Sequence, residues 1–599
     1  MTMRRVRWRQ LALLTGLAVL TVVAFLPALD GQFLNWDDEK NLVTNEGYRG
    51  LGWAQLRWMV TTTLMGHWIP LTWLTLGVNY VVGGMAPWGY HAGNVLLHAA
   101  NAVVFYAVAR RLLAAGTGAR EGVVVWGAVG AAAVFAVHPL RVESVAWVTE
   151  RRDVLSGLFF LLAVLSYLIA VERGAGGGLD SRWRGGSLGL FAAALLSKGS
   201  TMMLPAVLLL LDVYPLGRRG RGLRALVGEK IGYFALSALA GSIAVLALRS
   251  GGWAMTSYGD VGLFGRLALM TYSFTFYPWR WLWPVGLSPM YELPVTVNPF
   301  AWQFLLPLAA FPAITAALYA LRRRWPAGLA AWVYSALIVL PVSGAAHAGF
   351  QLAADRYSYL SGLGFAALAG GAVILLQEAA DSGRLRRGLA AALMATAVVA
   401  VVVLGAGAWR QSRVWHDSET LWRWAVSVDP ACALCQYNLG QALLVAHGSS
   451  PGHMRLAEEH FGRAIALRPE RDDAYNALGI TLALQGRLDE AAEAYREFLR
   501  RRPSAVPAAA TLGGIYVRQG RLDEAIPLLR RVLQLDSGRE GARRDLALAL
   551  DRQAEISMEQ GNVAEAERLR QEATELRTVA PAARPPADPS SRDSEGGLR

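Results

Sequence analysis

Long apolar runs separated by short arginine clusters fill the first 410 residues, and this alternation constrains the fold more than any other feature. An apolar run of about 20 residues can cross a bilayer as a helix, and loops rich in arginine or lysine stay on the cytoplasmic side. The chain is 54% hydrophobic and 17% charged over 599 residues. It is therefore predicted to be all-α, with a polytopic membrane helix bundle joined to a smaller soluble part.

The basic clusters predict the topology. After the N-terminal arginines they recur at residues 110–111, 182–184, 218–224, 322–324 and 384–387. If every cluster is cytoplasmic, an even number of crossings separates each consecutive pair. About eleven spans satisfy this rule, at residues 11–29, 91–110, 122–140, 153–171, 187–198, 200–214, 231–248, 301–321, 328–344, 358–377 and 388–408. The C-terminal part then lies on the outer side, and two further apolar segments, 68–83 and 266–285, are interpreted as interfacial or re-entrant.

Charge, cysteines and the N-terminus exclude several classes of protein. The net charge of +13 is carried by clusters between apolar runs, which is typical of cytoplasmic loops, so nucleic-acid binding is not expected. The only cysteines, Cys432 and Cys435, are interpreted as buried helix residues or a local disulfide, because no thioredoxin-like pattern surrounds them. The first apolar run is long for a cleaved signal peptide and is predicted to be an uncleaved anchor.

The last third of the chain is a repeat. The motif GRLDEA occurs at residues 486–491 and again at 520–525, a spacing of 34. This period resembles the tetratricopeptide repeat (TPR), and about four units are expected to form an α-solenoid with a concave groove. The predicted domains are a membrane domain (1–410), a TPR domain (411–579) and a disordered Pro/Ser-rich tail (580–599). Alone, the repeats indicate a protein-interaction module.

Two adjacent carboxylates follow the first apolar run, in FLNWDDEKNLVTN (residues 33–45). Asp37 and Asp38 are either part of a solvated acidic loop or a general base held at the outer membrane surface. An aspartate can accept the proton of an attacking hydroxyl. A second carboxylate beside it raises a carboxyl pKa and makes it a better base.

Polar side chains also occur at membrane depth, where they are costly. His91 and His98, with two asparagines between and after them, share one helical face. They either hydrogen-bond neighbouring helices or bind a ligand.

Several cations lie on the predicted outer side, against the usual charge rule. The segment HPLRVESVAWVTERRD contributes His138, Glu143, Arg151 and Asp153, and LLSKGS and AADRYSYL contribute Lys198 and Arg356. Either these cations bind an anionic ligand such as the phosphate of a lipid-linked donor, or each pairs with a carboxylate neighbour.

The acidic motif at residues 33–45 and the three segments around residues 138–153, Lys198 and Arg356 are followed by TPRs. Together they resemble the transmembrane and TPR-repeat O-mannosyltransferases, in particular their bacterial relatives, and more distantly the C-type glycosyltransferase (GT-C) fold. The resemblance implies an inverting transferase that uses a polyprenyl-phosphate sugar. It makes Asp37 the base, Asp38 its neighbour, and Arg356 and Lys198 the ligands of the donor phosphate. It assigns no individual role to the remaining motif residues, which are His138, Glu143, Arg151 and Asp153. Animal relatives have glutamate after the lysine where this chain has Gly199.

The resulting prediction is a cell-membrane protein with a cytoplasmic N-terminus and an external, periplasmic TPR domain. It would transfer a sugar, mannose by the family's default, to Ser/Thr hydroxyls of acceptor proteins that the TPR groove engages. The alternatives are a non-catalytic membrane-anchored scaffold and a transporter of lipid-linked sugars. The sequence names no sugar, and it shows no zinc-type cluster, although the acidic pair could hold Mg²⁺ or Mn²⁺.

Overall fold

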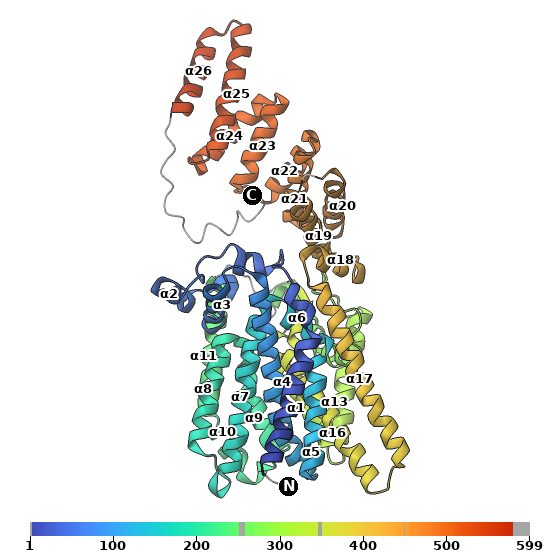
Figure 1. The fold of residues 1–599 in the computed structure, drawn as a ribbon. Coiled ribbons are helices and arrows are strands. Elements are labelled where there is room, and N and C mark those ends of the chain that lie inside the picture. The colour runs from blue at the N-terminus through green and yellow to red at the C-terminus, as the bar shows by residue number, and fades with distance from the viewer. Residues whose placement is uncertain (1–2, 251–257, 345–349, 449, 579–599) are drawn as a thin grey trace. The chain divides into compact units, whose positions relative to one another are not determined.

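The computed structural model describes residues 3–250, 258–344, 350–448 and 450–578, and these are almost entirely helical (Figure 1). They form two compact units, Met1–Val428 and Asp429–Arg599. The all-α prediction is confirmed. Residues 411–428 belong to the first unit, and the predicted disordered tail lies outside the described residues.

The first unit is a bundle of helices with one small sheet. The two strands, β1 (Tyr291–Glu292) and β2 (Gln351–Ala353), pair antiparallel. The helices are α1 (Met3–Ala24), α2 (Trp53–Thr61), α3 (Pro70–Gly83), α4 (Pro87–Thr117), α5 (Glu121–Val137), α6 (Val142–Ala146), α7 (Arg151–Arg173), α8 (Ser181–Ser197), α9 (Leu204–Val213), α10 (Leu223–Gly228), α11 (Ile231–Ser250), α12 (Tyr258–Leu282), α13 (Trp302–Ala320), α14 (Pro326–Val339), α15 (Ser358–Ser361), α16 (Leu363–Asp381), α17 (Arg387–Val414) and α18 (Ser418–Val428).

Each apolar run predicted to span the membrane is largely helical, although several of the runs are divided between two helices. Of the described helices, six are long and apolar enough to cross a bilayer, and a seventh is added if α5 and residues 139–146, bent by 57°, form one span. Three predicted spans are shorter apolar helices, at residues 8–24, 199–213 and 326–342. The prediction of about eleven spans therefore includes several helices that are short or broken in the structure. The predicted interfacial segments fall in α3 and α12, neither of which is among the six.

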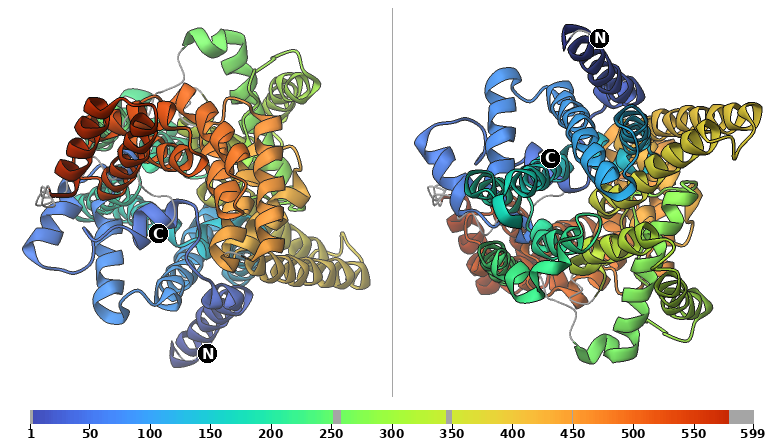
Figure 2. Two further views of the ribbon diagram at one scale, coloured as in Figure 1. Left: turned by 90° about the horizontal axis from the view of Figure 1, so that it is seen from above. Right: turned by 90° about the horizontal axis from the view of Figure 1, so that it is seen from below.

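Small residues allow the helices to approach closely. A Cβ on Gly127 in α5 would lie 2.8 Å from the carbonyl oxygen of Gly370 in α16, so these backbones are in direct contact. Close crossings at small residues are typical of membrane helix pairs. In both views of Figure 2 the N-terminal end of α1 lies at the rim of the bundle. The rim helices expose apolar side chains such as Val402 of α17, which is 65% exposed, as expected of a lipid-facing surface.

The predicted cytoplasmic loops meet at one end of the bundle. Arg111 at the end of α4 pairs with Glu172 at the end of α7, and Arg120 pairs with Asp381 at the end of α16. In Figure 1 this end also carries the N-terminus and α10, whereas α2 and α3 lie at the opposite end. The 23 residues of α7 rise roughly 34 Å, so its first turn lies about one bilayer thickness away from the basic loops.

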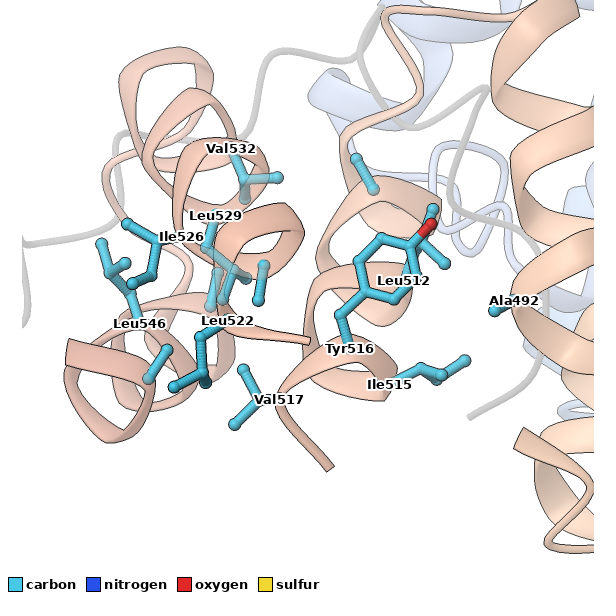
Figure 3. Close-up of a cluster of buried hydrophobic side chains, with 14 of the residues drawn as sticks. Ala492, Leu512, Ile515, Tyr516, Val517, Leu522, Ile526, Leu529, Val532 and Leu546 are labelled. Carbon is cyan, nitrogen blue, oxygen red and sulfur yellow. The ribbon is translucent and has the colours of Figure 1, made fainter. Parts of the chain in front are cut away.

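The second unit consists of four helix pairs, as the 34-residue period predicts. They are α19 (Ala433–His447) with α20 (Pro451–Leu467), α21 (Asp472–Leu484) with α22 (Leu488–Arg501), α23 (Val506–Gln519) with α24 (Leu522–Leu535), and α25 (Glu540–Glu559) with α26 (Val563–Thr578). Figure 3 shows part of the apolar core that joins α21 to α26, with Leu512, Leu529 and Leu546 from successive helices. Cys432 and Cys435 form a buried disulfide at the start of α19.

Gly513→Ala is expected to destabilise the second unit by about 1–3 kcal/mol, since overpacking a tight core has this cost. A Cβ at Gly513 would lie 2.6 Å from Leu529 of the paired helix. Gly462→Ala is the matched control, because nothing lies within 4 Å of that Cβ position and alanine favours a helix. Thermal unfolding of the full chain measures both. Equal midpoints would contradict the close packing inferred here.

Candidate functional site

The acidic loop, defined here as residues 33–45, lies against the segment between α5 and α7. Asp38 is fully buried, and its Oδ1 accepts hydrogen bonds from the amide (3.0 Å) and hydroxyl (2.6 Å) of Thr149. Its Oδ2 accepts the amide of Leu34 at 3.1 Å. Even with these donors, burial raises the pKa of Asp38 to about 7. Asp38 therefore fixes the loop and has little capacity left for a substrate.

Asp37 differs from its neighbour in having no partner. Its side chain is half-buried and makes no hydrogen bond or ion pair with any residue that the structure describes. Burial raises the pKa of Asp37, and the nearby Arg152 and Arg356 oppose that rise. A carboxylate that is fixed by its backbone, free at its oxygens and close to cations is well suited to accept a proton.

A break in the helical bundle places Thr149 beneath the acidic loop. After α5 the chain bends at Pro139, forms the five-residue α6 and then a 3₁₀ turn at Val148–Glu150 before α7 begins. Trp147 stacks on Trp36 of the acidic loop with ring centroids 4.5 Å apart. The bent segment and the loop thus form one packed unit at this end of the bundle.

A buried ion network lies beside the acidic loop, with Glu150 at its centre. Glu150 is 0% exposed and contacts Arg152 (2.6 Å), Lys198 (3.1 Å) and Arg356 (3.3 Å). Glu143 also pairs with Arg356, and Asp153 with Lys198. The network, defined by these six side chains, therefore holds three carboxylates and three cations. Buried charges of this kind persist only when they are paired and hydrogen-bonded.

The helix breaks at Lys198, as the sequence predicts, and this break allows the lysine to reach the ion network. Lys198 follows α8, and a 3₁₀ turn at Gly199–Met203 separates it from α9. Its ammonium also lies 5.9 Å from the ring centroid of Tyr357. Asp153 in the first turn of α7 and Glu150 directly before α7 thus supply the anionic partners that a glutamate at position 199 would have been expected to provide.

Arg356 reaches the network from the 3₁₀ turn Asp355–Tyr357, which follows β2. Its backbone amide donates to Glu143 at 2.8 Å, and its guanidinium donates to Gln351 of β2 at 2.7 Å. A hydrogen bond and an ion pair thus join Arg356 to Glu143, which lies 213 positions earlier in the chain. The alternative that each outer cation pairs with its own sequence neighbour does not describe Arg356, whose partners are Glu143 and Glu150.

Four predicted site residues lie outside the network. His98 contacts the hydroxyl of Tyr359 (2.8 Å) and a backbone carbonyl of α5 (3.0 Å), which is an interhelical role. His91 is buried on the same face of α4. His138 contacts the carbonyl of Trp281 at 3.0 Å. Arg151 donates to the carbonyl of Tyr90 and to the side chain of Asn94, both on α4.

The structure adds residues that sequence reasoning did not select. Glu150 and Arg152 are next to predicted residues in the run ERRD (residues 150–153). Because acidic and basic residues lie so close together there, the sequence suggests that they neutralise one another and does not indicate a role in a site. His67 lies in the loop between α2 and α3. Near the start of α3, the Thr72 hydroxyl donates to the carbonyl of Ser197, the residue before Lys198. Burial and the charge of Arg152 lower the pKa of His67 to about 3, so it is neutral at pH 7. A lone histidine in a loop gave no signal.

Among the described residues, no group of three His, Cys, Asp or Glu side chains is placed to hold a metal ion. Asp38 has both oxygens engaged with protein donors, and Asp37 alone is a weak ligand set for Mg²⁺ or Mn²⁺.

Thr149→Ala is expected to lower the free energy of unfolding by about 1–3 kcal/mol, because Asp38 would lose a buried hydroxyl donor. Thr149→Ser keeps the hydroxyl and is expected to stay close to wild type. Chemical denaturation in mild detergent compares the two variants. If alanine and serine have the same effect, the hydroxyl does not stabilise Asp38.

Comparison with known proteins identifies relatives of both parts. The tetratricopeptide repeat family matches residues 452–506 and 490–540. The chain is 34% identical over 205 residues to "Protein O-mannosyl-transferase Tmtc2" of Drosophila melanogaster, covering 32% of this chain and 21% of that protein. It is 32% identical over 214 residues to human "Protein O-mannosyl-transferase TMTC4", covering 33% and 29%. The matches thus span less than a third of these relatives.

Solved structures that are similar include ArnT from Cupriavidus metallidurans bound to undecaprenyl phosphate, with 14% identity, a TM-score of 0.33 and coverage of 81% of this chain and 79% of that one. Another is MamA, with 19% identity, a TM-score of 0.22 and coverage of 26% and 86%. The sequence matches confirm the resemblance stated from the motifs: about a third of this chain is similar to proteins named as O-mannosyl-transferases, and its C-terminal part contains tetratricopeptide repeats.

Proposed function

We propose that this protein is an inverting membrane glycosyltransferase that moves a sugar from a polyprenyl-phosphate donor to Ser/Thr hydroxyls of proteins. The observation that carries the proposal is Asp37, a carboxylate with no hydrogen bond or ion pair to any described residue, beside a buried network of three cations and three carboxylates. Relatives named as O-mannosyl-transferases support the reaction class. Mannose is the sugar that these names favour.

In the proposed reaction Asp37 accepts the proton of the acceptor hydroxyl as its oxygen attacks the anomeric carbon. The bond between that carbon and the donor phosphate breaks, and the phosphate leaves with the bonding electron pair. Because phosphate is a good leaving group, one carboxylate suffices, unlike the acid and base pair of glycosidases. Attack opposite to the leaving group inverts the anomeric centre.

Donors of the ion network are available for the phosphate. Lys198 has three N–H groups and uses two, for Glu150 and Asp153, among the described residues. Among the residues that the structure describes, Arg152 donates through Nε and Nη2, both to Glu150, and its Nη1 has no acceptor there. Cations placed where negative charge develops stabilise the transition state. Arg356 is more fully engaged than either, so its role is to orient Glu143 and Glu150 as well as to add charge.

The proposed orientation follows from the two ends of the bundle. The basic loops would face the cytoplasm, which places the acidic loop, the ion network and the repeats outside the cell membrane. A donor whose lipid chain lies in the bilayer and whose phosphate lies at its outer surface would meet the network there. The TPR unit would engage the acceptor protein.

The direct test uses the full chain purified in mild detergent. It is incubated with Ser/Thr peptides and a panel of polyprenyl-phosphate sugars that includes mannose, and products are identified by mass spectrometry and NMR. We expect transfer from a lipid-linked donor, none from the corresponding nucleotide sugar, and a product anomer opposite to that of the donor. Absence of transfer from every lipid-linked sugar, or retention of the anomer, would contradict the proposal.

A further inference from the structure

The acidic loop is held from its second side by the junction between α17 and α18. The amide of Gln32 donates to the carbonyl of His416 at 2.7 Å, and the amide of Asn35 donates to the hydroxyl of Ser418 at 2.8 Å. Both contacts join segments more than 380 residues apart in the chain. The loop that carries Asp37 is therefore anchored to the last helix of the first unit.

Trp422 of α18 makes the most direct of these contacts. Its indole N–H donates to the Asn35 side-chain oxygen at 2.7 Å, and its ring meets the edge of Trp36 with centroids 5.1 Å apart. Trp36 precedes Asp37 directly, and it also stacks on Trp147. Trp36 thus contacts both the bent segment that carries Thr149 and the helix that carries Trp422.

The burial of Trp422 shows that this contact is part of the folded structure. The side chain is 0% exposed, and an indole N–H left without an acceptor there would be costly. Trp424, two residues later, also donates its indole N–H, but to the carbonyl of Leu287 and not to the acidic loop. The two tryptophans therefore have different partners: Trp422 contacts the acidic loop, whereas Trp424 attaches α18 to the rest of the first unit.

We propose that Trp422 is a positioning residue for Asp37, acting through Asn35 and Trp36. The inference rests on the proposed role of Asp37 as the base. A proton acceptor must lie within hydrogen-bond reach of the attacking hydroxyl, and displacement by about 1 Å can cost on the order of 10²-fold in rate. α18 ends at Val428 and the second unit begins at Asp429, so the helix that is joined covalently to the repeats also contacts the acidic loop non-covalently through Trp422.

The test compares Trp422→Phe with Trp424→Phe, using kcat and KM for the lipid-linked donor, each normalised to folded protein by size-exclusion chromatography. Trp422→Phe keeps most of the ring and loses the N–H, and we expect about a tenfold fall in kcat with an unchanged KM. Trp424→Phe is expected to retain wild-type kcat. Asn35→Ala removes the acceptor of the same hydrogen bond from the loop side. If Trp422→Phe folds poorly, Asn35→Ala replaces it in the test and should show the same tenfold fall in kcat.

Combination with Asp37→Asn distinguishes positioning from a general structural role. If Trp422 acts through Asp37, adding Trp422→Phe to Asp37→Asn should not lower the residual rate further, since the two effects are not additive. An additional tenfold loss would overturn the inference, as would equal kcat for Trp422→Phe and Trp424→Phe. Retention of wild-type turnover by Asp37→Asn alone would instead contradict the proposed function on which the inference rests.

Discussion

Asp37→Asn is expected to lower kcat for sugar transfer by about 10²–10⁴-fold, the usual contribution of a general base. The free energy of unfolding should stay close to wild type, because Asp37 has no hydrogen bond or ion pair within the described part of the chain. Turnover measured by mass spectrometry and thermal unfolding in detergent test the two statements together. Wild-type turnover in this variant would exclude Asp37 as the base.

The pH dependence follows from the direction of the pKa shift. A base must be deprotonated to accept a proton, so kcat/KM should be high above the pKa of Asp37 and fall as the pH drops through it. Burial raises this pKa above the ordinary value of 3.8, so the fall should begin at a higher pH than for an exposed aspartate. Asp38→Asn is the contrasting variant. It should destabilise the protein, because an amide presents a donor where three donors already converge.

Glu150→Gln is expected to lower the free energy of unfolding by about 3–5 kcal/mol, because removing one member of a buried ion network leaves uncompensated charge. Glu150 is 0% exposed and contacts Arg152, Lys198 and Arg356. Glutamine keeps the shape of the side chain, so the loss reports the charge. Chemical denaturation in mild detergent provides the measurement.

The matched control is Glu121→Gln, which removes a carboxylate 69% exposed and paired with Arg110 at the other end of the bundle. Exposed pairs contribute about 0–1 kcal/mol, so this variant should resemble wild type. If Glu150→Gln costs no more than Glu121→Gln, the network does not depend on its central carboxylate.

Features with a local cause could be predicted from the sequence. The apolar runs became helices because their composition and length decide this over some 20 residues, and the 34-residue period fixed four helix pairs because each repeat contacts its neighbours. The break at Lys198 was also visible, since a glycine and polar residues interrupt an apolar run. The bends and short helices within the other apolar runs were not predicted, because apolar composition does not reveal them.

The partners within the candidate site could not be predicted, because they depend on contacts distant in sequence. Thr149 and Asp38 are 111 positions apart, and Arg356 and Glu143 are 213 apart. Motif resemblance selected Asp37, Asp38, Lys198 and Arg356 without indicating that, of these four, only Asp37 would have no partner among the described residues. The polar face of α4 was ambiguous for a related reason. Only the position of Tyr359, on another helix, shows that His98 joins helices.

The six side chains of the ion network are three basic and three acidic groups, whose charges sum to zero when all six are ionised. In the proposed reaction a phosphodiester with one negative charge becomes a monoester with two, while Asp37 loses its charge on protonation. The total charge of the site is therefore the same before and after transfer, and one negative charge moves from the acidic loop to the phosphate. The transfer step would then proceed without importing a counterion into a region of low dielectric constant.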